Sequence, residues 1–233
     1  MDRRAFFTKS AGKVAHAVTK HAAEKARQNA TRWIRPPFAI DELDFLIACS
    51  RCGDCISACQ YGVIFPLSSK LGVKVFNTPA LDLHSQGCHL CDSWPCVQAC
   101  DKAALKIPDI ADSTDQVNAA ETSSLYKTSP DIKLSTEALS EEESIEVKQN
   151  NQPQQKPLPK ISKVSINIKT CLPYSGPECG ACRVCPVEGA MIWDMEKPSI
   201  NNELCTGCAL CREACIIEPK AILVQSIYKS DVA

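Results

Sequence analysis

Sixteen cysteines dominate the chemistry available to this 233-residue chain, and they fall into four groups of four with none left over. The first and last groups follow the spacing C-x2-C-x2-C-x3-C, which is typical of thiolates that hold [4Fe–4S] clusters. At four thiolates per cluster, the chain is predicted to hold four such clusters and to move electrons. The groups are Cys49, Cys52, Cys55 and Cys59; Cys88, Cys91, Cys96 and Cys100; Cys171, Cys179, Cys182 and Cys185; and Cys205, Cys208, Cys211 and Cys215.

Two other uses of cysteine fit this spacing less well. Disulfide frameworks occur in small secreted domains that normally carry a secretory signal, and cysteines two residues apart pair poorly with each other. Zinc sites also contain C-x2-C pairs, but they usually place two pairs about a dozen or more residues apart. Three cysteines at successive gaps of two, followed by a fourth, favour an iron–sulfur cluster over both.

Ligands are predicted to cross between neighbouring groups. In proteins with two such clusters, the fourth cysteine of one run ligates the other cluster. The third group departs from the simple spacing, because only two residues separate Cys182 from Cys185, and this short gap leaves the crossed assignment open there. The predicted ligand sets are Cys49, Cys52, Cys55 and Cys100; Cys88, Cys91, Cys96 and Cys59; Cys205, Cys208, Cys211 and Cys185; and Cys171, Cys179, Cys182 and Cys215.

Two small units must position these ligands, one over residues 38–108 and one over 161–228, and together they form an internal repeat. A short helix is expected after the fourth cysteine of each group. The predicted class is α+β, with two bacterial dicluster ferredoxin-like units. Units of this size have little apolar core, so the clusters are expected to act as staples and the metal-free chain to be largely unfolded. Short strands are expected at Val73–Phe76, Ala104–Ile107, Val164–Ile168 and Ala221–Gln225.

Residues 109–160 separate the two units and have a different composition. They contain ten acidic residues and five lysines, with much Ser, Thr, Gln, Asn and Pro and few large apolar side chains. Such a segment cannot bury enough surface to offset the entropy lost on ordering. We predict a disordered acidic linker that acts as a spacer; shielding of the basic N-terminal arm is a second interpretation.

Residues 1–37 are predicted to form a basic helical arm. Up to Arg35 they contain nine Lys or Arg residues against two acidic ones, whereas the whole chain has a net charge of −1, which disfavours nucleic-acid binding. Small residues recur three or four apart from Ala11 to Ala30, and Pro36 and Pro37 end the pattern. The arm is either a solvated helix or a docking arm for a partner or an anionic membrane surface.

The start of the chain, DRRAFF, is similar to a twin-arginine export motif. An export signal also needs an apolar stretch of about 7–15 residues. Charged and histidine residues interrupt the sequence after this motif throughout, so the expected location is cytoplasmic, with the periplasm as the alternative. The chain contains no apolar run of transmembrane length, so no transmembrane segment is expected.

Substrate chemistry is absent from the sequence pattern. There is no Ser–His–Asp arrangement, phosphate-binding loop, or flavin or nicotinamide fingerprint, and His84 and His89 are interpreted as surface imidazoles. The chain is therefore expected to be an electron carrier or redox subunit without a substrate site of its own.

The cysteine groups and their surroundings resemble the ferredoxin-type proteins NapG and NapF of the periplasmic nitrate reductase system and MauM of methylamine utilisation. The C-x2-C-x4-C-x3-C group and the C-x7-C-x2-C opening are closer to NapG and MauM, whereas the missing export segment is closer to NapF. The similarity is carried by RPPFAIDELDFLIACSRCGDCISACQYGVI from Arg35, GCHLCDSWPCVQACDKAAL from Gly87, CLPYSGPECGACRVCP from Cys171 and CTGCALCREACIIEPKAI from Cys205.

Two functions follow from this resemblance. Similarity to NapG and MauM implies an electron-transfer protein that passes electrons from a membrane quinol-oxidising partner towards a reductase, and this is the leading hypothesis. Similarity to NapF implies a cytoplasmic interaction protein that assists maturation or iron–sulfur loading of a molybdenum reductase. Both imply redox partner proteins.

Overall fold

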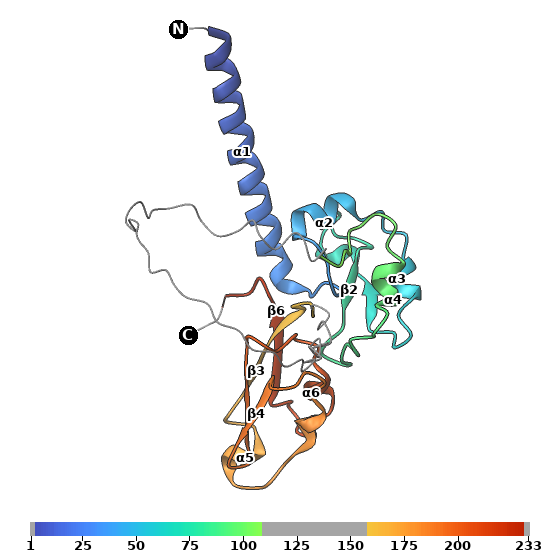
Figure 1. Ribbon diagram of the computed structural model, residues 1–233, viewed down its shortest axis with the longest axis vertical. Coiled ribbons are helices and arrows are strands. Elements are labelled where there is room, and N and C mark those ends of the chain that lie inside the picture. Colours follow the sequence, from blue (N-terminus) through green and yellow to red (C-terminus); the bar gives the residue numbers. More distant parts are fainter. Residues whose placement is uncertain (1–2, 109–157, 231–233) are drawn as a thin grey trace, which may run out of the picture. The chain divides into compact units, whose positions relative to one another are not determined.

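The computed structural model describes residues 3–108 and 158–230, with side chains from residue 16 onward. Nearly all of the predicted linker therefore lies outside the described residues. The two described stretches belong to one compact unit. The fold is mixed helix and strand, and Figure 1 shows the order of its elements.

The chain begins with the predicted N-terminal helix, α1 (Arg3–Asn29), which continues into a 3-10 turn, η1 (Ala30–Arg32). Side chains from residue 16 to residue 29 are mostly exposed, and Val18 is one of the exposed apolar residues. Burial begins at Ala30, whose carbonyl accepts a hydrogen bond from the Ser226 hydroxyl at 2.7 Å. Of the small residues in the predicted stripe, Ala30 is therefore the one that packs against the core. None of the described helices is long and apolar enough to cross a membrane.

A buried ion pair anchors the segment after η1 to the next helix, α2 (Glu42–Ala48). The Arg35 guanidinium donates to both carboxylate oxygens of Glu42, at 2.9 and 2.6 Å, and also to the Thr78 hydroxyl and the Pro79 carbonyl. The Trp33 indole donates to the same carboxylate at 3.3 Å. Because α2 ends where the first cysteine group begins, this network fixes the start of that group.

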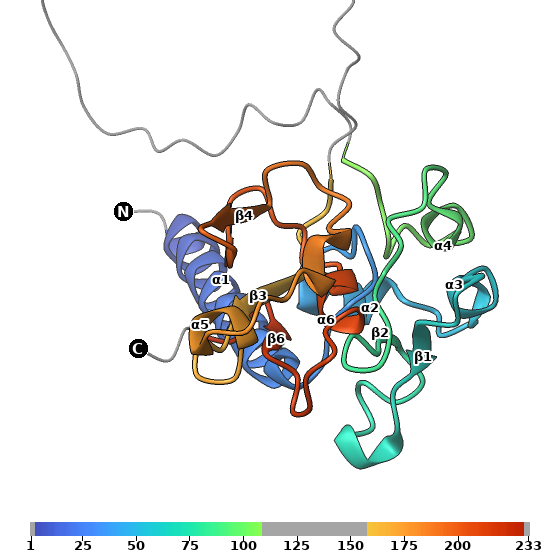
Figure 2. The ribbon, with the colours of Figure 1, turned by 90° about the horizontal axis from the view of Figure 1, so that it is seen from below.

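The first half of the unit then contains α3 (Asp54–Ser57), β1 (Ile64–Pro66), η2 (Ser69–Leu71), β2 (Pro79–Leu81) and α4 (Pro95–Gln98). Strands β1 and β2 pair in antiparallel fashion, with Ile64 opposite Leu81. Figure 2 shows the two short helices α3 and α4 beside each other, and they are in contact.

The second half contains β3 (Ser162–Ile166), α5 (Leu172–Ser175), η4 (Ala181–Val184), β4 (Met191–Asp194), β5 (Lys197–Ile200), α6 (Leu210–Glu213) and β6 (Ile222–Ser226). Strand β3 pairs with β6, and β4 pairs with β5, both in antiparallel fashion. The expected strands Val164–Ile168 and Ala221–Gln225 are therefore present as β3 and β6, each displaced by one or two residues.

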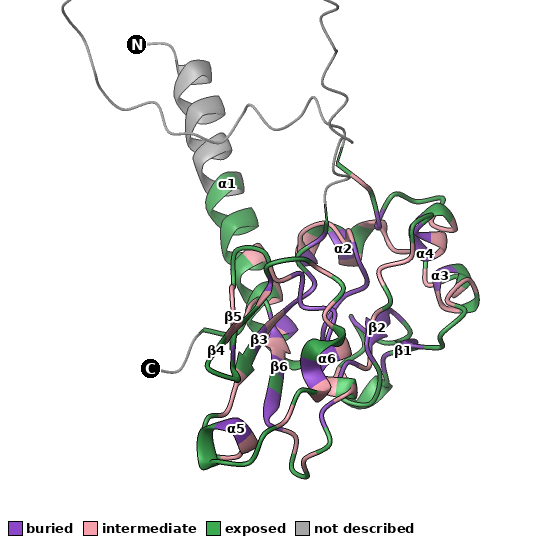
Figure 3. Cartoon of the chain, turned by 60° about the horizontal axis from the view of Figure 1, so that its bottom comes forward, coloured by how far each residue is buried: buried purple, intermediate pink, exposed green. Residues whose placement is uncertain are grey.

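Buried residues form a core that continues from the first half into the second. Phe45, Leu83 and Ile222 are among its most buried side chains, and six cysteines belong to it. Figure 3 shows buried positions along β2 and β6 and on the short helices, whereas α1 is largely exposed where its side chains are described. Thiols therefore occupy positions that aliphatic side chains fill in most proteins of this size.

Two expected strands are wrong. Residues 73–77 form turns, and Val73 and Phe76 are exposed because the turn directs them away from the core. Residues 104–107 contribute a single bridge between Leu105 and Ala39. The actual strands of the first half, β1 and β2, are only three residues long, too short to show a period-two pattern in the sequence.

Candidate metal centres

The third cysteine of every group lies at the second position of a short helix. Cys55 in α3, Cys96 in α4 and Cys211 in α6 occupy this position in four-residue α-helices, and Cys182 occupies it in η4. The expectation of a helix after each fourth cysteine is therefore wrong: the helix surrounds the third cysteine and ends before or at the fourth. The extra residues between Cys91 and Cys96 are accommodated before α4 begins.

Left-handed backbone recurs at matching positions in the first, second and fourth groups. Arg51, Leu90 and Gly207 each precede the second cysteine and have φ between 49° and 79°. The residue before each short helix is left-handed too, and these residues are Gly53, Trp94 and Ala209. A non-glycine residue in this region costs about 1–3 kcal/mol, and such strain gathers at functional sites. The repetition indicates that the backbone of each loop is bent so that its cysteine side chains point in a common direction.

The third group reaches a similar result by a different route. Gly180, which precedes η4, has φ −121°, and the 3-10 helix ends one residue before Cys185. In the other groups an alanine separates the last helical residue from the fourth cysteine. The short Cys182–Cys185 gap therefore changes how the helix ends and leaves the position of the third cysteine within it unchanged.

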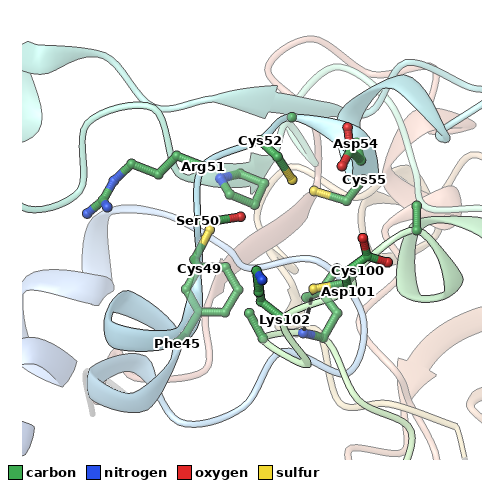
Figure 4. A pocket seen from close by; sticks show the side chains of 15 residues that line it. Phe45, Cys49, Ser50, Arg51, Cys52, Asp54, Cys55, Cys100, Asp101 and Lys102 are labelled. Carbon is green, nitrogen blue, oxygen red and sulfur yellow. Dashed lines mark hydrogen bonds between the residues drawn. The ribbon is translucent and has the colours of Figure 1, made fainter.

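Site A is the set Cys49, Cys52, Cys55 and Cys100. Figure 4 shows these four side chains around one opening, a cavity of about 150 Å³ that they line together with Phe45 and Lys102 among other residues. Burial, followed by the nearby Cys49, Cys100 and Cys52 thiolates, raises the pKa of the Cys55 thiol to about 11. Three thiols from the first group thus face one from the second.

Site B is the complementary set, Cys59, Cys88, Cys91 and Cys96. Burial raises the pKa of the Cys96 thiol to about 12, and Cys88, Cys59 and Cys91 add to the shift as neighbouring thiolates. Burial also raises the pKa of Cys88 to about 11. Site B is therefore less open to water than site A, which contains the exposed Cys52.

Site C is the set Cys185, Cys205, Cys208 and Cys211, and all four line one small pocket beside β3 and β5. Burial, and then the thiolates of the other three, raise the pKa of Cys211 to about 12. Burial also raises the pKa of Cys208, while the Leu210 backbone N–H and the Thr206 hydroxyl lower it. That hydroxyl is buried and makes no hydrogen bond of normal geometry among the described residues.

Site D is the set Cys171, Cys179, Cys182 and Cys215. Burial raises the pKa of the Cys182 thiol to about 11, and the thiolates that add to this shift are Cys171, Cys179 and Cys215. Cys171 shows the same direction of pKa shift, with burial first and Cys215 next. The set again combines three thiols of one group with the fourth cysteine of its neighbour.

The four thiols of site A line one cavity and the four thiols of site C line another, whereas in sites B and D the thiols shift one another's pKa. Burial makes each isolated thiolate unfavourable, and four thiolates around one space repel one another, so the sets suit a cationic iron–sulfur core that keeps them ionised. Among the described residues, no group of three or more Cys, His, Asp or Glu side chains is placed so that it could hold a single metal ion. Four thiolates per set are a donor chemistry that iron–sulfur clusters use.

Sequence reasoning missed several groups that contact the thiols. The Leu105 backbone N–H donates to the Cys100 sulfur at 3.4 Å, and the Gln60 amide lies 3.9 Å from the Cys91 sulfur. His89, expected to be a surface imidazole, is exposed and stacks on Tyr61 with ring centroids 3.6 Å apart. The one available signal was position, because each of these residues except Leu105 lies next to a cysteine or one residue away.

The chain is similar over most of its length to proteins named as ferredoxin-type. It is 28% identical over 82% of its length to the ferredoxin-type protein NapG of Haemophilus influenzae, and 29% identical over 83% to the methylamine utilization ferredoxin-type protein MauM of Paracoccus denitrificans. It is 22% identical over 81% of its length to the ferredoxin-type protein NapF of Escherichia coli. The predicted resemblance to these three is therefore confirmed.

The similarity covers unequal shares of these relatives. The chain spans 58% of the Haemophilus NapG protein, 71% of the Paracoccus MauM protein and 83% of the Escherichia coli NapF protein. No protein-family model matches the chain. No solved structure matches it either.

Proposed function

We propose that the protein is an electron carrier that holds four [4Fe–4S] clusters, one in each of sites A to D. The observation that carries this proposal is the composition of the sites: each combines three thiols of one cysteine group with the fourth cysteine of its neighbour. This exchange of ligands is the pattern of two-cluster ferredoxins. Each half of the compact unit then corresponds to one dicluster ferredoxin-like unit.

The protein's own groups have distinct roles in this proposal. The sixteen thiolates would hold the clusters, which supply one-electron oxidation and reduction when bound. Backbone and side-chain donors such as the Leu105 N–H and the Thr206 hydroxyl would stabilise the negative charge on sulfur. The third cysteine of each cysteine group is buried, and this burial keeps water away from its sulfur atom.

Iron content and ligand exchange can be tested together. The anaerobically purified protein is expected to contain about sixteen iron atoms and sixteen acid-labile sulfides per chain, because each cluster contains four of each. Reduction should give the electron-spin signal of interacting [4Fe–4S] centres. Zinc in place of iron, or two iron atoms or fewer per chain, would exclude the proposal.

A pair of double variants tests the crossed ligand sets. Cys59→Ser/Cys96→Ser removes two ligands of site B and is expected to cost one cluster, or about four iron atoms. Cys55→Ser/Cys59→Ser removes one ligand each from sites A and B and is expected to cost two clusters, or about eight iron atoms. If ligands did not cross, the first variant would lose more iron than the second.

The partners follow from the resemblance. We propose that the chain exchanges electrons with redox proteins, with a membrane quinol-oxidising protein as donor and a reductase as acceptor. Higher identity to NapG and MauM than to NapF supports transfer over a role in assembly. Pull-down separates the two: a quinol-oxidising partner supports transfer, whereas capture of metal-free molybdenum reductase supports assembly.

A cytoplasmic location remains our proposal, because the sequence after DRRAFF lacks an apolar stretch. Cell fractionation with an antibody tests it. Recovery of the protein from the periplasm would favour the twin-arginine interpretation of the motif.

A further inference from the structure

We propose that the four sites form a single file in the order A, B, C, D, and that electrons cross between the two halves where Gly87 and Cys88 contact the turn from Cys208 to Glu213. This inference rests on the proposed function, because it orders the clusters that the function requires. If the sites hold clusters, the contact would let one electron pass from a reduced cluster held by the cysteines of site B to an oxidised cluster held by the cysteines of site C. No bond forms or breaks, and no proton is transferred.

The first and last steps of the file lie within the halves. Helices α3 and α4, which hold Cys55 of site A and Cys96 of site B, are in contact. Helices α6 and η4, which hold Cys211 of site C and Cys182 of site D, are in contact as well.

The middle step is set by a backbone hydrogen bond between ligands of different halves. The Cys88 N–H donates to the Cys208 carbonyl at 2.7 Å. Site B is thus joined to site C through two residues that are themselves proposed ligands.

Gly87 is the positioning residue of this contact. It is buried, and a Cβ atom added to it would lie 2.7 Å from the Leu210 nitrogen and 2.8 Å from the Leu210 Cα. These are backbone atoms of α6, which cannot move aside as a flexible side chain can. Only glycine therefore allows the loop of site B to approach the helix of site C this closely.

A carboxylate adds a second link at the same place. The Gly87 N–H donates to Glu213 Oε2 at 2.7 Å, and the Arg212 guanidinium donates to the His84 carbonyl at 3.3 Å. Residues 84–88 are therefore held to residues 208–213 by three hydrogen bonds in addition to the packing of Gly87 on Leu210.

The ends of the file differ in exposure. Cys52 in site A is the one cysteine of the sixteen, all of which are described, that is classed as exposed. Site B and site C lie at the junction between the halves. Electrons from an outside partner are thus expected to enter or leave at site A.

Gly87→Ala in the full iron-loaded chain tests the contact. The variant is expected to keep about sixteen iron atoms per chain but to lose the part of the spin–spin interaction in the reduced protein that joins sites B and C. The matched control is Gly180→Ala, because a Cβ there meets only the flexible side chain of Arg183, at 3.1 Å or more. The control should keep the wild-type spectrum.

A second pair of variants decides the outcome if Gly87→Ala fails to fold. Glu213→Ala removes the acceptor of the Gly87 N–H and should weaken the same interaction, whereas Glu213→Gln keeps an oxygen acceptor and should restore it. If iron-loaded Gly87→Ala gave the wild-type spectrum, the inference would be overturned and the proposed function would stand. If Gly87→Ala did not load iron, a wild-type spectrum from Glu213→Ala would have the same meaning. A wild-type protein without iron would instead refute the proposed function.

Discussion

The buried ion pair between Arg35 and Glu42 gives the sharpest stability prediction. Glu42 is fully buried, and the side chain of Arg35 is only 7% exposed. Removing one member of a buried pair costs about 3–5 kcal/mol, because the other charge stays buried without compensation. For a chain of this size, Arg35→Met should then lower the melting temperature by roughly 6–20 °C, at about 2–4 °C per kcal/mol.

The structure supplies a matched control in Arg27 and Asp41, which are also paired at 2.8 Å but have side chains that are 53% and 29% exposed. An exposed pair contributes about 0–1 kcal/mol, so Arg27→Met should have little effect. The double variant Arg35→Met/Glu42→Gln removes both charges and should recover much of the loss. It should not recover all of it, because the Pro79 carbonyl loses its donor, at a cost of about 1 kcal/mol.

Anaerobic urea titration followed by tryptophan fluorescence measures these differences, since Trp33 contacts the carboxylate directly. Iron content is the second readout, because α2 ends at Cys49, and loss of its anchor should release the cluster of site A first. Equal destabilisation by Arg35→Met and Arg27→Met would refute the reasoning, as would a double variant less stable than Arg35→Met alone.

Three further predictions concern the sites. Thr206→Val removes a buried hydroxyl that lowers the pKa of Cys208 in site C, and it should lower one reduction potential by roughly 20–60 mV, which corresponds to about 0.5–1.5 kcal/mol of hydrogen-bond stabilisation of the thiolate; an unchanged redox titration would contradict this. Gly207→Ala should destabilise the protein more than Gly53→Ala in urea titration, because both have positive φ but only Gly207 packs against the β3 backbone; equal losses would contradict it. Chelation of the iron-loaded chain at pH 8 should abolish most of its far-UV dichroism, because units of this size have little apolar core without the clusters; dichroism that survives removal of the iron would contradict it.

The sequence predicted which cysteines share a short loop, because gaps of two residues leave few geometries. It also predicted the N-terminal helix, which ends before two prolines, and the strands β3 and β6, whose β-branched residues alternate. These features depend on residues close together in the chain. The strand expected at Val73–Phe76 was wrong because an apolar run of four residues is equally compatible with an exposed turn.

Other features depend on contacts between distant residues and could not be predicted. The helix around each third cysteine has only four residues, and its start is set by a left-handed residue such as Trp94 or Ala209 that has no preference for that conformation. Gly87 reads as an ordinary loop glycine in the sequence, and its role is visible only where it meets Leu210, more than a hundred residues later. Secondary-structure propensity predicts neither the short helices around the third cysteines nor the close approach at Gly87.

The short elements and the buried thiols are two consequences of one physical constraint. No strand of the described chain exceeds five residues, and the α-helices after α1 have four to seven residues, so backbone hydrogen bonding alone cannot hold these segments. Cys55, Cys96, Cys182 and Cys211 occupy core positions among the aliphatic side chains. If the sites hold clusters, each cluster replaces the missing core and fixes the strained loops around it. Folding and cofactor binding are then the same event, and a variant that loses one cluster should also loosen the neighbouring site with which it shares a cysteine group.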